Sequence, residues 1–167
     1  VINIEAGDAV ISAFKQALSY AVIAISVILL LLLPNKLDSA LAMSALLFAV
    51  IVTGGISVFL DIPLNFANII ALPLLLGIGV DSAIHILHRH RTALPEDNNV
   101  LATSSARAVI VSTFTTMGSI GNLAFSPHAG TASMGKLLTI GIGMTLVATL
   151  VILPGLLSGN SWGQSKN

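Results

Sequence analysis

The sequence predicts an all-α membrane protein with five transmembrane helices. Of its 167 residues, 55% are hydrophobic and only 8% are charged, and the mean hydropathy is +0.97. A soluble domain carries about 25% charged residues. Five apolar segments approach or exceed the roughly 20 residues that a helix needs to cross a bilayer. None of them alternates between polar and apolar residues, so a helical bundle is expected rather than a barrel.

The first two helices are expected at residues 18–33 and 39–60. The first is a mostly apolar run that stops at Pro34, and the second stops before Asp61-Ile62-Pro63, because both breaks are rich in turn-forming residues. Residues 1–17 are expected to form an amphipathic lead-in at the periplasmic surface, with turns at 9–16 that can lengthen the first helix.

The last three helices are expected at residues 64–88, 102–125 and 131–157. A sizeable polar loop, from Arg89 to Ser105, separates the third helix from the fourth, and Ser126-Pro127-His128 separates the fourth from the fifth. The five helices form a membrane domain over residues 18–158. The small polar residues at 159–167 predict a disordered cytoplasmic tail.

The positions of lysine and arginine predict the orientation, because positive charges concentrate on the cytoplasmic side. The N-terminus is therefore expected in the periplasm and the C-terminus in the cytoplasm. The chain does not begin with methionine and has no signal peptide, so we expect a piece of a longer polypeptide. The cytoplasmic set is Lys36, Arg89, Arg91, Arg107 and Lys166, and the opposite set is Lys15 and Lys136.

Several classes of function are disfavoured. The net charge is zero and there is no basic stripe, which argues against a nucleic-acid partner. There is no cysteine, which excludes disulfides and thiolate chemistry. No serine has a base at a spacing that suits nucleophilic catalysis, and the glycines around Ile78 do not complete a dinucleotide fingerprint. We expect no enzyme activity, no cofactor and no metal site.

Asp81 is the most informative residue, because it lies within an apolar segment. A charged residue at the centre of a membrane helix costs about 2.5–3.5 kcal/mol even on mild scales, so it is a functional hypothesis by default. Positions three, four and seven apart share a helix face. The third helix therefore has a stripe of small and polar residues, made of Gly77, Asp81, Ser82, His85 and His88.

A similar stripe on the fourth helix consists of Ser112, Thr115, Thr116, Ser119 and Asn122. We expect the two stripes to face each other inside the bundle, with the hydroxyl groups of Thr115 or Thr116 donating hydrogen bonds to Asp81. Small residues let membrane helices approach closely. The expected packing positions are Gly77, Gly79, Gly118, Gly135 and Gly143.

Simpler readings remain open for each of these residues. The hydroxyl stripe on the fourth helix is also typical of plain helix packing. Asp81 could be a permanently neutral, hydrogen-bonded acid. His88 lies beside Arg89 and suits the membrane interface, whereas His85 is one turn deeper and could share a proton with Asp81. Apolar surroundings favour the protonated form of a carboxyl group, which suits proton loading and release in transporters.

The segment Gly77-Ile78-Gly79-Val80-Asp81 resembles the Gly-x-Gly-x-Asp helix of the resistance–nodulation–division (RND) superfamily. The following segment at residues 108–118, and the Phe125-Ser126-Pro127 turn, are similar to the next helix and turn in that superfamily. Residues 65–73 favour the MMPL-type lipid-exporting branch, and most of all its hopanoid-biosynthesis-associated transporters. The resemblance covers nearly the whole chain.

The resemblance implies the last five helices of the second half of a proton-driven exporter of lipids in the inner membrane. Asp81 would carry the proton, with Ser112, Thr115, Thr116 and His85 around it. Many relatives have tyrosine where this chain has Ser82, which puts a direct hydrogen bond between the two halves in doubt. The expected partners are the bilayer, protons, a hydrophobic or lipid substrate, and the missing N-terminal half or a second subunit.

Two other functions fit the same residues. The chain could be a non-transporting fragment or a split-gene or pseudogene product, acting at most as an assembly or sterol-sensing-like membrane module. It could also be a small cation carrier that uses Asp81 and His85.

Overall fold

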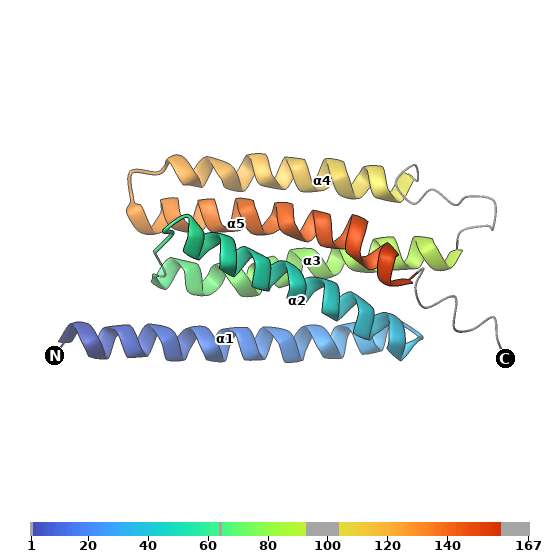
Figure 1. Ribbon diagram of the computed structural model, residues 1–167, viewed down its shortest axis with the longest axis horizontal. Helices are drawn as coiled ribbons and strands as arrows, with labels where there is room; N and C mark the ends of the chain where they lie inside the picture. Colours follow the sequence, from blue (N-terminus) through green and yellow to red (C-terminus); the bar gives the residue numbers. More distant parts are fainter. Residues whose placement is uncertain (1, 64, 93–103, 158–167) are drawn as a thin grey trace.

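The computed structural model describes residues 2–63, 65–92 and 104–157. Within these residues the chain is helical and contains no strand, and each of the five long helices is long and apolar enough to cross a membrane. The predicted fold class is therefore confirmed (Figure 1). The expected tail at 159–167 and most of the polar loop lie outside the described residues. The long helices are α1 (Ile2–Leu32), α2 (Lys36–Phe59), α3 (Phe66–Thr92), α4 (Ser104–Gly121) and α5 (Ala129–Val147).

The helix bounds differ from the expected ones by a few residues at most ends, so that α2 begins at Lys36 and α3 continues to Thr92. α1 begins at Ile2, because the amphipathic turns ahead of the apolar run contain no proline to break them. α4 tightens into a short 3-10 segment, η2 (Asn122–Phe125), before its turn. α5 continues through a π-helical segment, η3 (Ala148–Ile152), and the helical span ends at Leu157.

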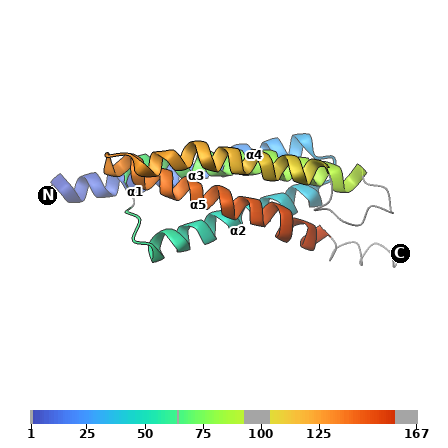
Figure 2. The same cartoon turned by 90° about the horizontal axis from the view of Figure 1, so that it is seen from above.

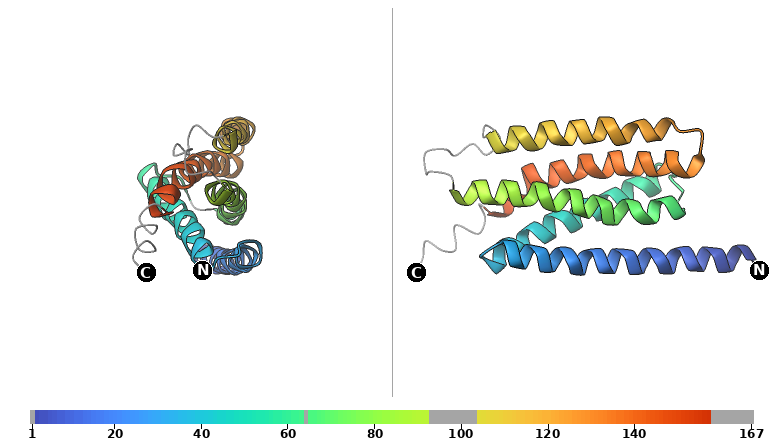
Figure 3. Two further views of the ribbon diagram at one scale, coloured as in Figure 1. Left: turned by 90° about the vertical axis from the view of Figure 1, so that its right-hand side faces the viewer. Right: turned by 180° about the vertical axis from the view of Figure 1, so that it is seen from behind.

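The helices form two layers. One layer contains α1, α3 and α4 side by side, and the other contains α2 and α5 (Figures 2 and 3). α3 packs against α1, α2 and α5, whereas α4 packs mainly against α5. One broad side of α3 therefore lies against the second layer, and none of the described helices covers its opposite side.

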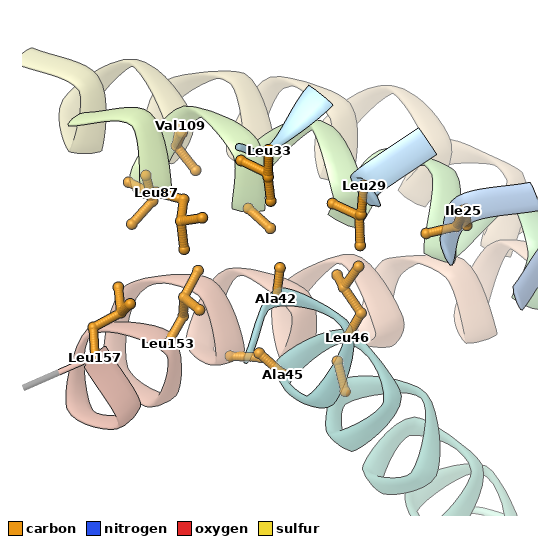
Figure 4. Close-up of a cluster of buried hydrophobic side chains, with 14 of the residues drawn as sticks. Ile25, Leu29, Leu33, Ala42, Ala45, Leu46, Leu87, Val109, Leu153 and Leu157 are labelled. Atoms are coloured by element: carbon orange, nitrogen blue, oxygen red, sulfur yellow. The ribbon is translucent and has the colours of Figure 1, made fainter. Parts of the chain in front are cut away.

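The core is apolar and lies between the two layers. Leu29, Leu46, Leu87 and Leu153 are almost completely buried where α1, α2, α3 and the end of α5 converge (Figure 4). Small residues of α2, such as the buried Ala42, let this helix lie close to its neighbours in the cluster. A second cluster around Leu75, Leu137 and Ile142 joins α3 to α5.

Asparagine side chains cap the N-termini of α2 and α3. The Asn35 side chain accepts a hydrogen bond from the Leu37 amide at 3.1 Å, and the Asn65 side chain accepts from the Ala67 amide at 3.0 Å. Such caps satisfy amide groups that have no partner within the helix. Pro73 lies inside α3, where it removes one backbone hydrogen bond.

Candidate functional site

Asp81 lies on the side of α3 that is turned away from α2 and α5. Gly79, on the opposite side, contacts Leu46 of α2 and Thr145 of α5, whereas the Asp81 side chain is 78% exposed. His85 follows one turn later and is 65% exposed, and its Nε2 lies 3.5 Å from Oδ1 of Asp81. The structure thus brings together the two residues expected to share a proton, and the pair is ionic when the histidine is protonated.

The exposed side of α3 changes character along its length. Toward the start of the helix it is apolar, and from Asp81 onward it carries titratable groups. We call this surface the open face of α3, and it consists of Ile70, Leu74, Gly77, Asp81, His85 and His88.

The hydroxyl stripe of α4 does not meet Asp81, so the expectation that the two stripes face each other inside the bundle is wrong. The Thr115 hydroxyl donates to the Val111 carbonyl at 2.8 Å, and the Thr116 hydroxyl donates to the Ser112 carbonyl at 2.8 Å. Threonine hydroxyls often bond to the preceding turn of their own helix. The physical reason is the position of α5, against which the more apolar sides of both α3 and α4 are buried.

The five expected packing glycines fall into two groups. A Cβ atom on Gly79 would lie 2.6 Å from Leu46 Cδ2, one on Gly135 would lie 2.5 Å from the Ala124 amide nitrogen, and one on Gly143 would be in ordinary contact with Met117. By contrast, a Cβ atom on Gly77 or Gly118 would have nothing within 4 Å. These two glycines pack against no described residue, and their packing role stays a prediction.

Gly141 is a packing position that the sequence reasoning missed. A Cβ atom there would lie 2.6 Å from Leu75 Cδ2. Its separations from Gly135 and Gly143, six and two residues, place it on another side of the helix, so the glycine spacing gave no signal for it.

An ion pair between Asp38 and Arg91 was also missed. The Asp38 side chain is only 3% exposed, and Arg91 Nε donates to its Oδ2 at 2.8 Å while a terminal guanidinium nitrogen donates to Oδ1. This fork joins the first turn of α2 to the end of α3, beside a cavity of about 390 Å³ that Pro34 and His88 also line. Hydrogen bonding to Asp38 raises the pKa of Arg91 against the opposing effect of partial burial.

The described residues contain no group of three histidine or acidic side chains that could hold a metal ion. Asp81 and His85 alone offer two ligands, fewer than a stable site for a transition metal needs.

Comparisons with known proteins agree on a family. Residues 5–164 match the MMPL family. The chain is 42% identical over 154 residues to the hopanoid transporter HpnN of Rhodopseudomonas palustris (strain TIE-1), a match that covers 92% of this chain and 17% of that protein. It is 36% identical over 164 residues to the hopanoid transporter HpnN of Burkholderia multivorans (strain ATCC 17616 / 249), covering 98% of this chain and 18% of that protein.

The chain therefore spans less than a fifth of the length of these two curated relatives. No solved structure matches it.

Proposed function

Because the chain belongs to the MMPL family, we propose that it is the C-terminal membrane portion of a proton-driven exporter of hopanoids or other hydrophobic molecules. The relatives are named as hopanoid transporters, and the substrate class is carried over from them. We place it in the bacterial inner membrane, with Lys36, Arg89 and Arg107 on the cytoplasmic side. It acts as a transporter and not as an enzyme.

The Asp81–His85 pair carries this proposal. Both side chains are exposed within the span Ile70–Arg89, where contact with lipid tails would be costly for a charged carboxylate. Binding a proton removes the charge of a carboxylate, and releasing the proton to water or to a neighbouring base restores it. Asp81 can therefore take up and release a proton.

His85 gives the proton a second position. It lies one turn closer to the end of α3 that carries Arg89 and Arg91, so it extends the path toward the proposed cytoplasmic side. The hydroxyl oxygens of Ser112, Thr115 and Thr116 can still accept hydrogen bonds. In this proposal they hold water beside the pair.

The open face of α3 needs a cover. Lipid-exposed titratable groups are rare in membrane helices and almost always face protein or a water-filled cavity. We propose that the other half of the transporter, or a second subunit, packs against this face. Gly77 has open space above it and would allow close approach.

The test is export by the full-length transporter that contains this chain. Asp81→Asn keeps the size and hydrogen-bonding capacity of the side chain but cannot carry a proton. We expect export to fall at least tenfold with normal membrane insertion, and proton uptake coupled to export to disappear. Asp8→Asn, a change of another exposed acid in α1, is the matched control and should leave export unchanged. Normal export by the Asp81→Asn variant at normal expression would refute the role of Asp81.

A second variant tests whether His85 belongs to the proton path. His85→Gln removes a proton acceptor but leaves Asp81 intact. We expect slower export, with the loss reduced at low external pH because more protons are then available. An unchanged pH profile would remove His85 from the path.

A further inference from the structure

Lys136 is a cation within a membrane span that has no protein partner in the described chain. It is exposed on α5, and the part of the chain that the structure describes supplies no carboxylate within ion-pair distance of it. Asp61 lies across a groove from it without forming an ion pair. A charged group in a span requires a counter-charge or access to the interface.

Its depth places it near the lipid headgroups. The span Ala129–Leu157 contains 29 residues, which is about 43 Å of helix, against a hydrocarbon core of about 30 Å. The Lys136 backbone is about 10 Å from the start of this span, so it lies just inside the hydrocarbon boundary. Side chains on a helix tilt toward its N-terminus, and lysine extends its ammonium group to the interface.

Lys136 stands between two grooves that meet at Ile140. The first, which we call the turn groove, has a volume of about 470 Å³ and runs past Leu60 and Pro63 to Ala132. The second, the η2 groove, has a volume of about 700 Å³ and lies between α4, η2 and α5. Apolar side chains such as Leu60 and Phe125 line them. Their lining residues lie toward the end of the bundle where α2 ends and α5 begins, which is the left-hand end in Figure 1.

The turn groove is held in place by hydrogen bonds one turn from Lys136. The buried Ser133 hydroxyl oxygen accepts from Asn65 Nδ2 at 2.6 Å and its proton is directed to the Gly130 carbonyl at 3.0 Å. Asn68 Nδ2 donates to the Pro63 carbonyl at 2.7 Å. The turn before α3 is thereby tied to α5.

The η2 groove is fixed by the residue next to Lys136. A Cβ atom on Gly135 would lie 2.7 Å from the Leu123 carbonyl carbon, so the backbone of η2 lies directly against α5. Ser133 and Gly135 thus hold the two walls, and Lys136 projects between them.

We propose that Lys136 and these two grooves bind a phospholipid of the surrounding leaflet. The lipid phosphate pairs with the Lys136 ammonium group, and the acyl chains lie in the turn groove and the η2 groove. A phosphate supplies the missing counter-charge, and acyl chains fill apolar surface that the chain leaves open. This site is remote from the proton pair and does not depend on the proposed transport cycle.

Native mass spectrometry of the full-length protein, purified in detergent and supplied with phosphatidylglycerol, tests the site. We expect Lys136→Gln to lose one retained phospholipid per chain and Lys136→Arg to keep it. The matched control is Lys15→Gln, which removes the same charge from an exposed position in α1 that lines neither groove. Equal losses in the two glutamine variants, no loss in Lys136→Gln, or a wild-type protein that retains no lipid would each overturn the proposal.

Two further experiments distinguish the contribution of the lipid headgroup to binding from that of the acyl chains. Gly118 lines the η2 groove, and a Cβ atom there meets no atom within 4 Å, so Gly118→Leu should fold normally and weaken retention although Lys136 is intact. Soluble glycerol 3-phosphate offers the phosphate without the chains and should not displace the lipid at equal concentration. Displacement by it, or full retention in Gly118→Leu, would show that the grooves contribute nothing.

Discussion

Asp38 and Asp81 are both acidic residues within apolar helices, yet their surroundings are opposite. Asp38 is buried and held by the two-pronged hydrogen bond from Arg91, whereas Asp81 is exposed with His85 beside it. Arg91 stays charged at any physiological pH, so the first pair is a permanent tie between α2 and α3. The second pair joins two side chains that can each gain or lose a proton, so it suits a reversible step.

The contribution of the Asp38–Arg91 pair can be measured as a change in the free energy of unfolding. Arg91→Gln leaves the Asp38 carboxylate buried without its counter-charge, which costs about 3–5 kcal/mol for fully buried pairs. Because Arg91 is half exposed, we expect about 2 kcal/mol here. The measurement is reversible unfolding in detergent micelles. Asp38→Asn combined with Arg91→Gln should recover part of the loss, and a double variant as unstable as the sum of the singles would contradict an interaction between them.

At the scale of the helix, two glycines of α3 show how packing differs between its sides. Gly79 is closed in by Leu46 and Thr145, whereas Gly77 has open space above it. The two are near neighbours in sequence, but they point to opposite sides of the same helix.

We therefore expect alanine to act differently at the two positions. Gly79→Ala forces neighbouring side chains to move and should lower the free energy of unfolding by about 1–3 kcal/mol. Gly77→Ala should be neutral or should raise it by up to about 1 kcal/mol, because alanine favours the helix. Unfolding of both variants of this chain in the same micelles compares them directly. Equal effects would mean that α3 is not packed as described.

At the scale of the whole molecule, the two layers formed by the described helices leave one broad side of α3 uncovered. This is the side that carries Asp81, and the relatives are several times longer than this chain. A cover from the rest of a transporter would turn an exposed acid into one that is shielded from lipid.

Oxygen accessibility of spin labels detects such a cover. The chain has no cysteine, so single substitutions within it can be labelled cleanly once any cysteine elsewhere is removed. Leu74 lies on the open face of α3, about two turns after the start of that helix. Ile51 is exposed on α2 about two turns before the end of that helix, so the two positions lie near the same end of the bundle. In the full-length protein in lipid, we expect Leu74→Cys to be several-fold less accessible to oxygen than Ile51→Cys. Equal accessibility would mean that lipid covers the open face.

The sequence by itself determined the five membrane helices and singled out Asp81 as the candidate functional residue. Both follow from contiguous residues, because hydrophobicity over about 20 positions defines a span and one acid interrupts it. Helical spacing also determined that Asp81 and His85 share a face. The family resemblance followed from the same segment.

Only the tertiary structure decided which face is covered. Spacing along a helix tells which residues point the same way, but not which neighbouring helix lies there. The position of α5 turned the stripes of α3 and α4 outward, and the approach of α2 to α3 paired Asp38 with Arg91. These contacts join residues far apart in the sequence, so no local pattern encodes them.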